Sequence, residues 1–314
     1  MDMNEKKKET VGKITLDYSF YKGEDLYSDG DAVENQLLEI VKSGRDYSYA
    51  MEEYTSWPVL YHLSRQRENI TGPMDIQKTD EVLEVGAGPG AVTGALARMA
   101  GHVDCIELSR RRSLINAYRH KDMDNIHIFV GNFEDVKPGK QYDVICLIGV
   151  LEYACYYTPA EDPYGKFLKS VRKLLKPNGR VYVAIENKLG MKYFAGYHED
   201  HTGKRFSGIE GYKEEDHVRT FTRSELQGLL KRTGFMNPVF YYPFPDYKFP
   251  TLILNDDTIR DADIDMKTFT NCDMPVLYLF DQTKAMAALK GTKERRIFAN
   301  SFLVEAVNAK EEEG

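Results

Sequence analysis

The chain has 314 residues, of which 42% are hydrophobic and 12% aromatic, and its formal net charge at pH 7 is −7. This is enough apolar sequence for one sizeable α/β core with attachments, or for two modest domains. The negative charge argues against general nucleic-acid binding, which needs an excess of Lys and Arg. No apolar run suits a leader or a membrane span, and Cys105 and Cys146 lie in apolar runs typical of buried, reduced thiols. We therefore expect a cytoplasmic protein without membrane insertion.

The first half of the chain changes its periodicity near residue 80. Residues 1–30 are polar and expected to be partly loose, whereas apolar positions in 31–71 recur at the spacing of two or three helices. Beyond residue 80, short apolar strands alternate with helical stretches, which predicts a doubly wound, mostly parallel α/β sheet. The expected strands are 81–86, 103–107, 126–130, 142–148 and 180–186, and the expected helices are 90–100, 109–119 and 164–175.

The second half is less regular. Thr222–Glu225 has the pattern of a helix N-cap, and Gly234 would end that helix. Prolines 243, 245 and 250 argue against regular structure at the start of an insertion, and the apolar stretches 239–242 and 297–307 predict a late antiparallel strand pair. The expected domains are an N-terminal helical cap (1–70), a cofactor-binding core (71–245), an insertion on the acceptor side (246–295), and a last core strand with a tail (296–314).

The most informative motif is a glycine-rich turn. Residues 82–90 read Val-Leu-Glu-Val-Gly-Ala-Gly-Pro-Gly, which suits a buried parallel strand leading into a turn that approaches a ligand closely. Glu107 closes the next apolar run. An acid at this distance is typical of a doubly wound domain that holds an adenosine ribose. An ordinary strand-to-helix turn would explain one such glycine, but it explains the whole combination poorly.

Two adenosine cofactors compete for this motif. Gly86-x-Gly88-x-x-Ala91 fits the dinucleotide pattern, which predicts an NAD-dependent oxidoreductase. Glu84 would repel a pyrophosphate at the following helix N-terminus, but it would attract the cationic amino group of S-adenosyl-L-methionine (SAM). We therefore favour SAM.

With these motifs the sequence resembles the class I SAM-dependent methyltransferases, over roughly residues 55–245 and 296–308. The resemblance implies a Rossmann-like fold with a seven-stranded sheet whose last strand is antiparallel. The motifs that carry it are Glu84–Gly90, Glu107, Gly131–Asp135, Asp143–Tyr153, the turn Lys176–Gly179 and the strand Arg180–Ile185.

The resemblance also implies a set of cofactor contacts. The glycine turn would lie against the methionine and ribose of SAM, and Glu107 would accept hydrogen bonds from both ribose hydroxyls. Asn132 stands where the family often has Asp, beside the adenine. The residues that we expect at the cofactor are Glu84, Gly86, Ala87, Gly88, Gly90, Glu107, Leu108, Asn132, Phe133, Ile148 and Gly149.

A helix before the core offers further contacts. Tyr61 and either Arg65 or Arg67 are expected on one helix, where the Tyr could face the sulfonium and Arg65 could pair with the SAM carboxylate. Ordinary helix-surface residues are an equal alternative.

The loops after the fourth and fifth strands are where the acceptor is expected. A hydroxyl acceptor loses a proton during methyl transfer, so a base is needed beside it. His201 with Asp200 or Glu199 is the first candidate, and Glu152 is the next. A solvated polar loop is the alternative. A His/Asp/Glu metal site would be another, but the spacing follows no template and we expect no metal.

A narrower resemblance concerns residues 186–212. This stretch is similar to methyltransferases found alongside, or fused to, bacterial glycosyltransferases of surface polysaccharide biosynthesis. It implies a sugar hydroxyl as acceptor and a glycosyltransferase as partner. The sequence thus predicts an O-methyltransferase for a glycan or other small polar acceptor. The alternatives are a non-glycan small molecule or a protein as acceptor, an NAD-dependent oxidoreductase, and a non-catalytic SAM-binding protein.

Overall fold

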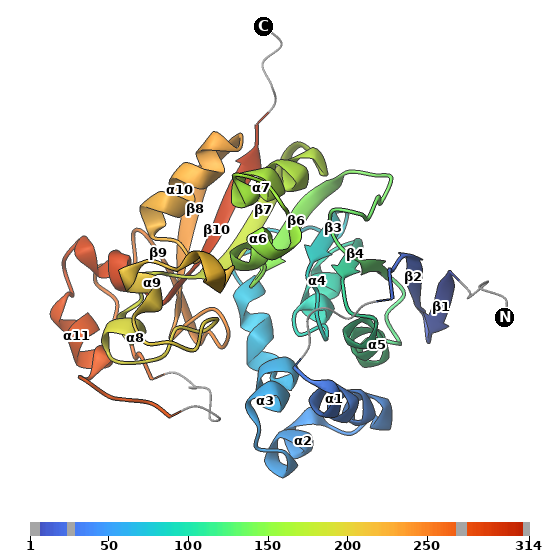
Figure 1. Ribbon diagram of the computed structural model, residues 1–314, viewed down its shortest axis with the longest axis horizontal. Coiled ribbons are helices and arrows are strands. Elements are labelled where there is room, and N and C mark those ends of the chain that lie inside the picture. The colour runs from blue at the N-terminus through green and yellow to red at the C-terminus, as the bar shows by residue number, and fades with distance from the viewer. Residues whose placement is uncertain (1–6, 24–28, 268–274, 310–314) are drawn as a thin grey trace, which may run out of the picture. The chain divides into compact units, whose positions relative to one another are not determined.

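A computed structural model describes residues 7–23, 29–267 and 275–309 (Figure 1). The chain divides into two compact units, Met1–Cys146 and Leu147–Gly314. These units do not coincide with the domain boundaries expected from the sequence, which stay a prediction.

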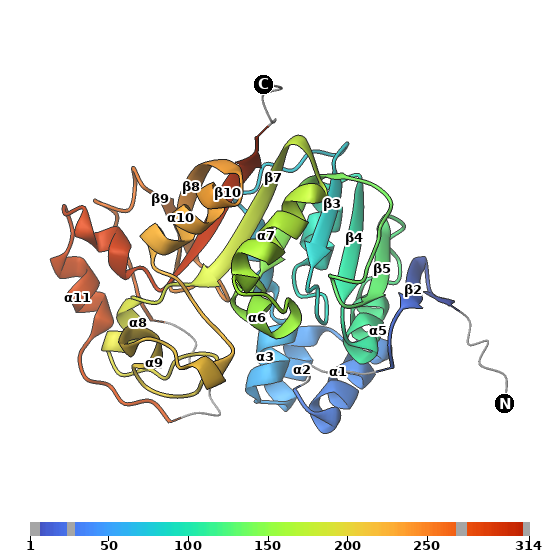
Figure 2. The same cartoon turned by 45° about the horizontal axis from the view of Figure 1, so that its top comes forward.

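The first unit is built on a mostly parallel sheet with the strand order β1-β2-β5-β4-β3-β6. Neighbours β2 and β5, β5 and β4, and β4 and β3 are parallel, and Figure 2 shows β3, β4 and β5 side by side. The bounds are β1 (Lys8–Val11), β2 (Ile14–Phe20), β3 (Glu81–Val85), β4 (His102–Glu107), β5 (Ile126–Gly131) and β6 (Tyr142–Ile148).

The antiparallel hairpin of β1 and β2 was not expected. Residues 8–20 are therefore not loose, and the region 1–70 is not purely helical. The hairpin turns at Gly12, whose φ is +57°, and a Cβ there would lie 2.2 Å from the carbonyl oxygen of Lys121. Ile14 and Leu16 alternate with polar residues and are fully buried, so the hairpin adds two strands to the sheet.

Helices cover the sheet of the first unit as the periodicity predicted. The helices of 31–71 pack against α5 through an apolar cluster that includes Leu37, Val59, Leu63 and Ile115. Fully burying one such side chain contributes about 2 kcal/mol. The bounds are α1 (Asp31–Ser43), α2 (Tyr47–Glu53), α3 (Trp57–Leu63), η1 (Arg65–Thr71), α4 (Thr93–Met99) and α5 (Arg110–Arg119).

The second unit has an antiparallel sheet with the order β7-β10-β8-β9. β10 is the expected late antiparallel strand, and it lies between β7 and β8. The described residues thus hold more strands than the seven expected, although the Rossmann-like class is as predicted. The bounds are β7 (Leu175–Glu186), β8 (Phe235–Phe244), β9 (Leu252–Asn255) and β10 (Ser301–Asn308).

Two expectations about this sheet are wrong. The segment 176–179 was expected to be a turn before the strand, but it lies within β7, where Asn178 has a φ of +63°. Pro243 was expected to exclude a strand, but it lies in β8 opposite Ile253 of β9. β10 pairs with β8 only as far as Tyr241. Pro243 therefore lies beyond this pairing, and its lack of a backbone N–H costs no hydrogen bond to β10.

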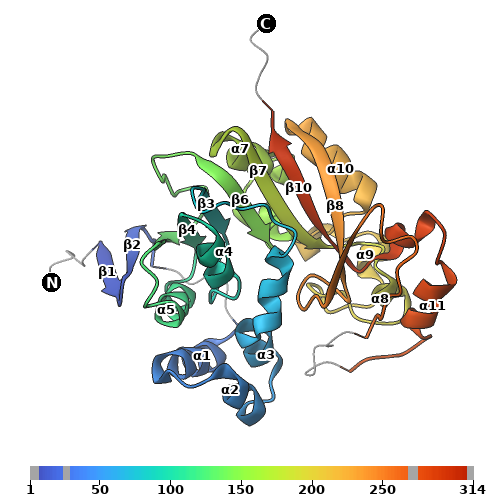
Figure 3. The same ribbon diagram turned by 180° about the vertical axis from the view of Figure 1, so that it is seen from behind.

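Helices of the second unit pack on this sheet. α10 lies on one face of β8 beside α7 (Figures 1 and 3), and Thr222 and Glu225 form the predicted capping box at its start. The bounds are η2 (Leu151–Tyr153), α6 (Ala154–Tyr157), α7 (Pro163–Lys173), α8 (Met191–Phe194), α9 (Ser207–Glu210), η3 (Glu214–Asp216), α10 (Arg223–Arg232), α11 (Gln282–Ala288) and η4 (Glu294–Phe298).

The glycine turn after β3 yields a matched pair of substitutions. Gly88 (φ +53°) and Gly90 (φ +77°) both have left-handed backbone, but only at Gly90 would a Cβ clash, 2.3 Å from Oδ1 of Asn116. Asn116 is fully buried, and its amide is hydrogen-bonded to Thr93 and His120, so it cannot move aside.

We expect Gly90→Ala to destabilise the fold more than Gly88→Ala. Both carry a backbone strain of about 1 kcal/mol, and Gly90→Ala adds about 1–3 kcal/mol of overpacking. Urea denaturation of the two variants measures the difference, and equal losses would show that the turn relaxes freely.

Candidate functional site

Glu107 fastens the glycine turn. One carboxylate oxygen accepts the backbone N–H of Gly88 at 2.8 Å, and the other accepts that of Ser109, also at 2.8 Å. The parallel register aligns Val85 with Ile106, so the turn after β3 and the end of β4 meet at one edge of the sheet. Burial raises the pKa of Glu107. A carboxylate offers about four acceptor sites, so this one can still accept hydrogen bonds from a ribose diol.

Glu84 does not have the environment expected of it. Its side chain is buried, and one oxygen accepts a hydrogen bond from Oγ1 of Thr93 at 2.5 Å and lies 3.6 Å from Sγ of Cys105. Burial raises the pKa of Glu84 to about 7. Near neutral pH it is therefore only partly charged, which weakens the charge argument by which the sequence favoured SAM.

Asn132 and Phe133 follow β5, as expected. Oδ1 of Asn132 accepts the backbone N–H of Glu134 at 3.1 Å, so the side chain caps its own loop. Phe133 and Leu108 are half-buried and Ala87 is buried. The adenine contacts expected of this segment stay predictions.

Tyr61 and Arg65 do not share a helix, because α3 ends at Leu63 and η1 begins at Arg65. Arg65 is exposed, whereas Arg67 is buried with its guanidinium 4.3 Å from the ring centroid of Tyr61. Of the two arginines weighed from the sequence, Arg67 is the one ordered beside Tyr61.

Gly149 follows Ile148, the last residue of β6. Its φ is +70°, and its N–H donates to the carbonyl of Ala184 at 3.0 Å. A Cβ at Gly149 would lie 2.8 Å from Oη of Tyr247, so this strand end has room only for glycine.

In the second unit, His201 lies among three buried glutamates. Its Nδ1 is 2.8 Å from Oε1 of Glu199, and its Nε2 is 3.6 Å from Oε1 of Glu152 and 3.7 Å from Oε2 of Glu186. Burial alone would lower the pKa of His201, but the charge of Glu186 and the contacts with Glu152 and Glu199 outweigh it and raise that pKa well above its usual value. Burial also raises the pKa of Glu152.

Asp200 is not the acid that orients His201. Its carboxylate accepts hydrogen bonds from Lys248 at 2.8 Å and from Tyr193 at 2.6 Å, and it pairs with Lys192 at 2.8 Å. Burial would raise the pKa of Asp200, but the two lysines lower it well below its usual value. Of the two acids weighed beside His201, the structure selects Glu199.

Glu186 is the member of this cluster that sequence reasoning left out of the candidates. It is the last residue of β7, and it is fully buried. An acid that closes an apolar strand is the same signal that identified Glu107, so the pattern was present in the sequence.

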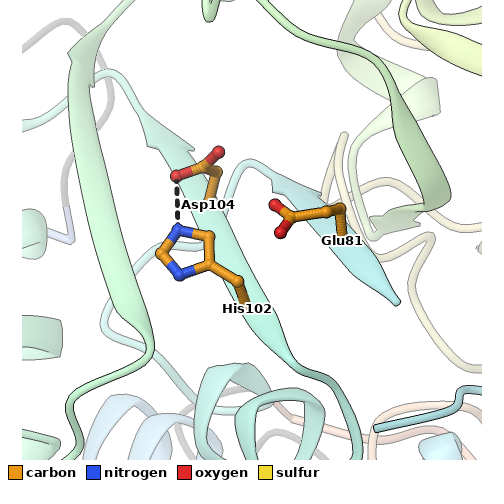
Figure 4. A group of neighbouring side chains, drawn as sticks. All are labelled: Glu81, His102 and Asp104. Atoms are coloured by element: carbon orange, nitrogen blue, oxygen red, sulfur yellow. Dashed lines mark hydrogen bonds and ion pairs between the residues drawn. The ribbon is translucent and has the colours of Figure 1, made fainter. Parts of the chain in front are cut away.

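A second acid–histidine group lies in the first unit (Figure 4). His102 and Asp104 of β4 are 3.1 Å apart, and the carboxylate of Glu81 on β3 points toward them. Nζ of Lys140 lies 2.8 Å from Asp104 and also contacts Glu81. The ammonium group of Lys140 thus already neutralises both carboxylates.

Comparison with known proteins identifies the class. Residues 59–237, more than half of the chain, match the family model described as a methyltransferase domain, so the chain belongs to this family. A phosphoethanolamine N-methyltransferase from Haemonchus contortus, solved with S-adenosylhomocysteine, has the same fold, with a TM-score of 0.51 at 13% identity over 92% of this chain and 53% of that one.

The curated relatives match this chain over part of their length. The ubiquinone biosynthesis O-methyltransferase of Rickettsia canadensis is 27% identical over 123 residues, which cover 39% of this chain and 49% of that protein. The demethylmenaquinone methyltransferase of Tropheryma whipplei is 34% identical over 104 residues, which cover 33% of this chain and 41% of that protein. The matched segments thus span half or less of these relatives.

The chain therefore carries a methyltransferase domain with a Rossmann-like α/β fold, as the motifs predicted. The nicotinamide alternative is set aside. Among the described residues, no helix is long and apolar enough to cross a membrane.

The raised pKa of Glu84 makes stability depend on pH. The folded pKa of about 7 lies above the ordinary value of 4.5, so the unfolded chain releases this proton first as pH rises. This contribution to stability is present at low pH and is lost between those two values.

We expect Glu84→Gln to remove this loss. From about pH 5 to about pH 8, wild type should lose about 2 kcal/mol more unfolding free energy than the variant. Chemical denaturation at both pH values measures it, with the exposed Glu39→Gln as control. Equal losses of unfolding free energy in wild type, Glu84→Gln and Glu39→Gln would contradict the raised pKa of Glu84.

Proposed function

We propose that this methyltransferase transfers the SAM methyl group to a hydroxyl oxygen of a small polar acceptor. The positively charged sulfur of SAM is already a good leaving group, so the protein has to position the acceptor and remove its proton. The observation that carries this proposal is the buried cluster of His201, Glu152 and Glu186, since a carboxylate in this cluster can take a proton from a hydroxyl.

Within the cluster, Glu152 is best suited to receive the proton. The charge of Glu186 and the contacts with Glu152 and Glu199 raise the pKa of His201 well above its usual value, so with no other cation beside it the imidazole holds its own proton and is not the base. Oε2 of Glu152 is buried without a hydrogen-bond partner, and burial raises the pKa of this carboxyl, which makes it a stronger base than an exposed Glu. His201 lies beside this carboxylate, with Nε2 3.6 Å from Oε1 of Glu152.

The acceptor class is proposed from resemblance. The resemblance of residues 186–212 favours a sugar hydroxyl, and with it a glycosyltransferase partner. The Rickettsia relative is named as an O-methyltransferase of ubiquinone biosynthesis, which supports oxygen as the methylated atom but suggests a different acceptor. We propose the glycan first and a small hydroxylated ring second.

SAM binding is tested through Glu107. We expect Glu107→Ala to weaken SAM binding about tenfold to hundredfold, because the ribose loses its acceptor and the turn loses its anchor. Isothermal calorimetry measures this, with Glu39→Ala on the exposed side of α1 as control. Unchanged affinity would refute the assigned ribose site.

The role of the cluster is tested by turnover. His201→Ala and Glu152→Gln should each lower methyl transfer about 10²-fold or more while SAM affinity stays within twofold of wild type. The measurement is S-adenosylhomocysteine release with a panel of sugars, phenols and quinols. Full activity in both variants would place proton removal elsewhere, and SAM binding without turnover on any acceptor would favour a non-catalytic role.

A further inference from the structure

The spacing within the His201 cluster is that of ligands around an ion. Nε2 of His201 lies 3.6 Å from Oε1 of Glu152 and 3.7 Å from Oε2 of Glu186, which is too long for good hydrogen bonds. One such atom from each of the three residues lies within 4.8 Å of the others. Two ligands that each lie about 2.1 Å from a tetrahedral ion are about 3.4 Å apart.

The imidazole is held in the orientation of a metal ligand. Its Nδ1 lies 2.8 Å from Oε1 of Glu199, so this carboxylate can accept the Nδ1 proton and leave Nε2 toward Glu152 and Glu186. Glu199 is itself fixed by the backbone N–H groups of His201 and Thr202, at 2.9 and 2.7 Å. A carboxylate behind the imidazole is the usual support of a metal-binding histidine.

The cluster also has buried oxygens that lack a partner. Oε2 of Glu152 and Oε2 of Glu186 are buried without a hydrogen bond, and both residues are at most 1% exposed. A buried acceptor that is left without a hydrogen bond destabilises the fold. Lys248 contacts Oε1 of Glu186, whereas Oε2, which has no hydrogen bond, lies on the side of His201.

The local charge favours a cation. Around His201 the carboxylates outnumber the lysines, and Lys192 is shared with Asp200 and Asp246. The carboxylates are Glu152, Glu186, Glu199, Asp200 and Asp246, and the lysines are Lys192 and Lys248.

From these observations we propose that Glu152, Glu186 and His201 bind one divalent cation. One imidazole and two carboxylates form a mixed nitrogen and oxygen set, which favours Mn²⁺ or Zn²⁺ over Mg²⁺ and Ca²⁺, whose sites are built from oxygen alone. Three protein ligands leave coordination positions for water or an oxygen of a bound molecule. Cation binding goes beyond the proposed function and does not depend on the acceptor.

The group of Glu81, His102 and Asp104 provides a matched comparison (Figure 4). It also has one imidazole and two carboxylates, but the ammonium of Lys140 contacts both of its carboxylates. It therefore needs no added cation, and Glu81→Gln serves as the control variant.

The test uses the full chain after chelator treatment and dialysis, with Mn²⁺ as the probe. Titration followed by electron paramagnetic resonance should show one bound Mn²⁺ per chain, and pulsed spectra of that ion should show coupling to one imidazole nitrogen. Absence of stoichiometric binding of both Mn²⁺ and, by calorimetry, Zn²⁺ at millimolar concentration would overturn the proposal. So would a bound Mn²⁺ without nitrogen coupling.

Variants then locate the ion. Glu152→Gln and His201→Gln should each weaken Mn²⁺ binding at least tenfold, and His201→Gln should also remove the nitrogen coupling, while Glu81→Gln binds as wild type does. Binding that survives both cluster variants, or that is lost in Glu81→Gln, would contradict the site. The wild-type spectrum decides the question even if a variant fails to fold, and none of these readouts requires methyl transfer.

Discussion

The two hydrogen bonds of the Glu107 carboxylate are the interaction on which the glycine turn, and with it the proposed cofactor site, depends. One oxygen holds Gly88 of the turn after β3, and the other holds Ser109, the N-cap of α5. The parallel register of β3 and β4 brings these segments to the same edge of the sheet. Because Glu107 is buried and still has acceptor capacity, we propose that one side chain both shapes the turn and accepts hydrogen bonds from a ribose.

In the second unit several acidic side chains are buried close together, and each needs partners for its oxygens. Glu199 is satisfied by backbone N–H groups and by His201, and Asp200 is satisfied by Lys192 and Lys248. In this group, Glu152 and Glu186 each keep one buried oxygen without a hydrogen bond. Buried charge of this kind is costly unless it serves binding or chemistry, which is why both proposals concern these residues.

The sequence was sufficient where one local pattern decides the structure. The alternating strands and helices of 80–186, the glycine turn and the Thr222 capping box were all predicted, because each depends on residues close together in the chain. The β1–β2 hairpin was not predicted. Gly12 between alternating apolar residues is a hairpin signal, but the polar residues on both sides of it suggested a loose segment. The burial of Glu84 and the choice of Glu199 over Asp200 depend on distant residues such as Thr93 and Lys248, which no local pattern contains.

A crystal structure of the protein with S-adenosylhomocysteine would show whether Glu107 binds the ribose. We expect the ribose hydroxyls within hydrogen-bonding distance of the Glu107 carboxylate, and the homocysteine against the turn Gly86–Gly90. A nucleoside bound at another edge of the sheet, or a turn whose side chains fill the space beside Glu107, would contradict it.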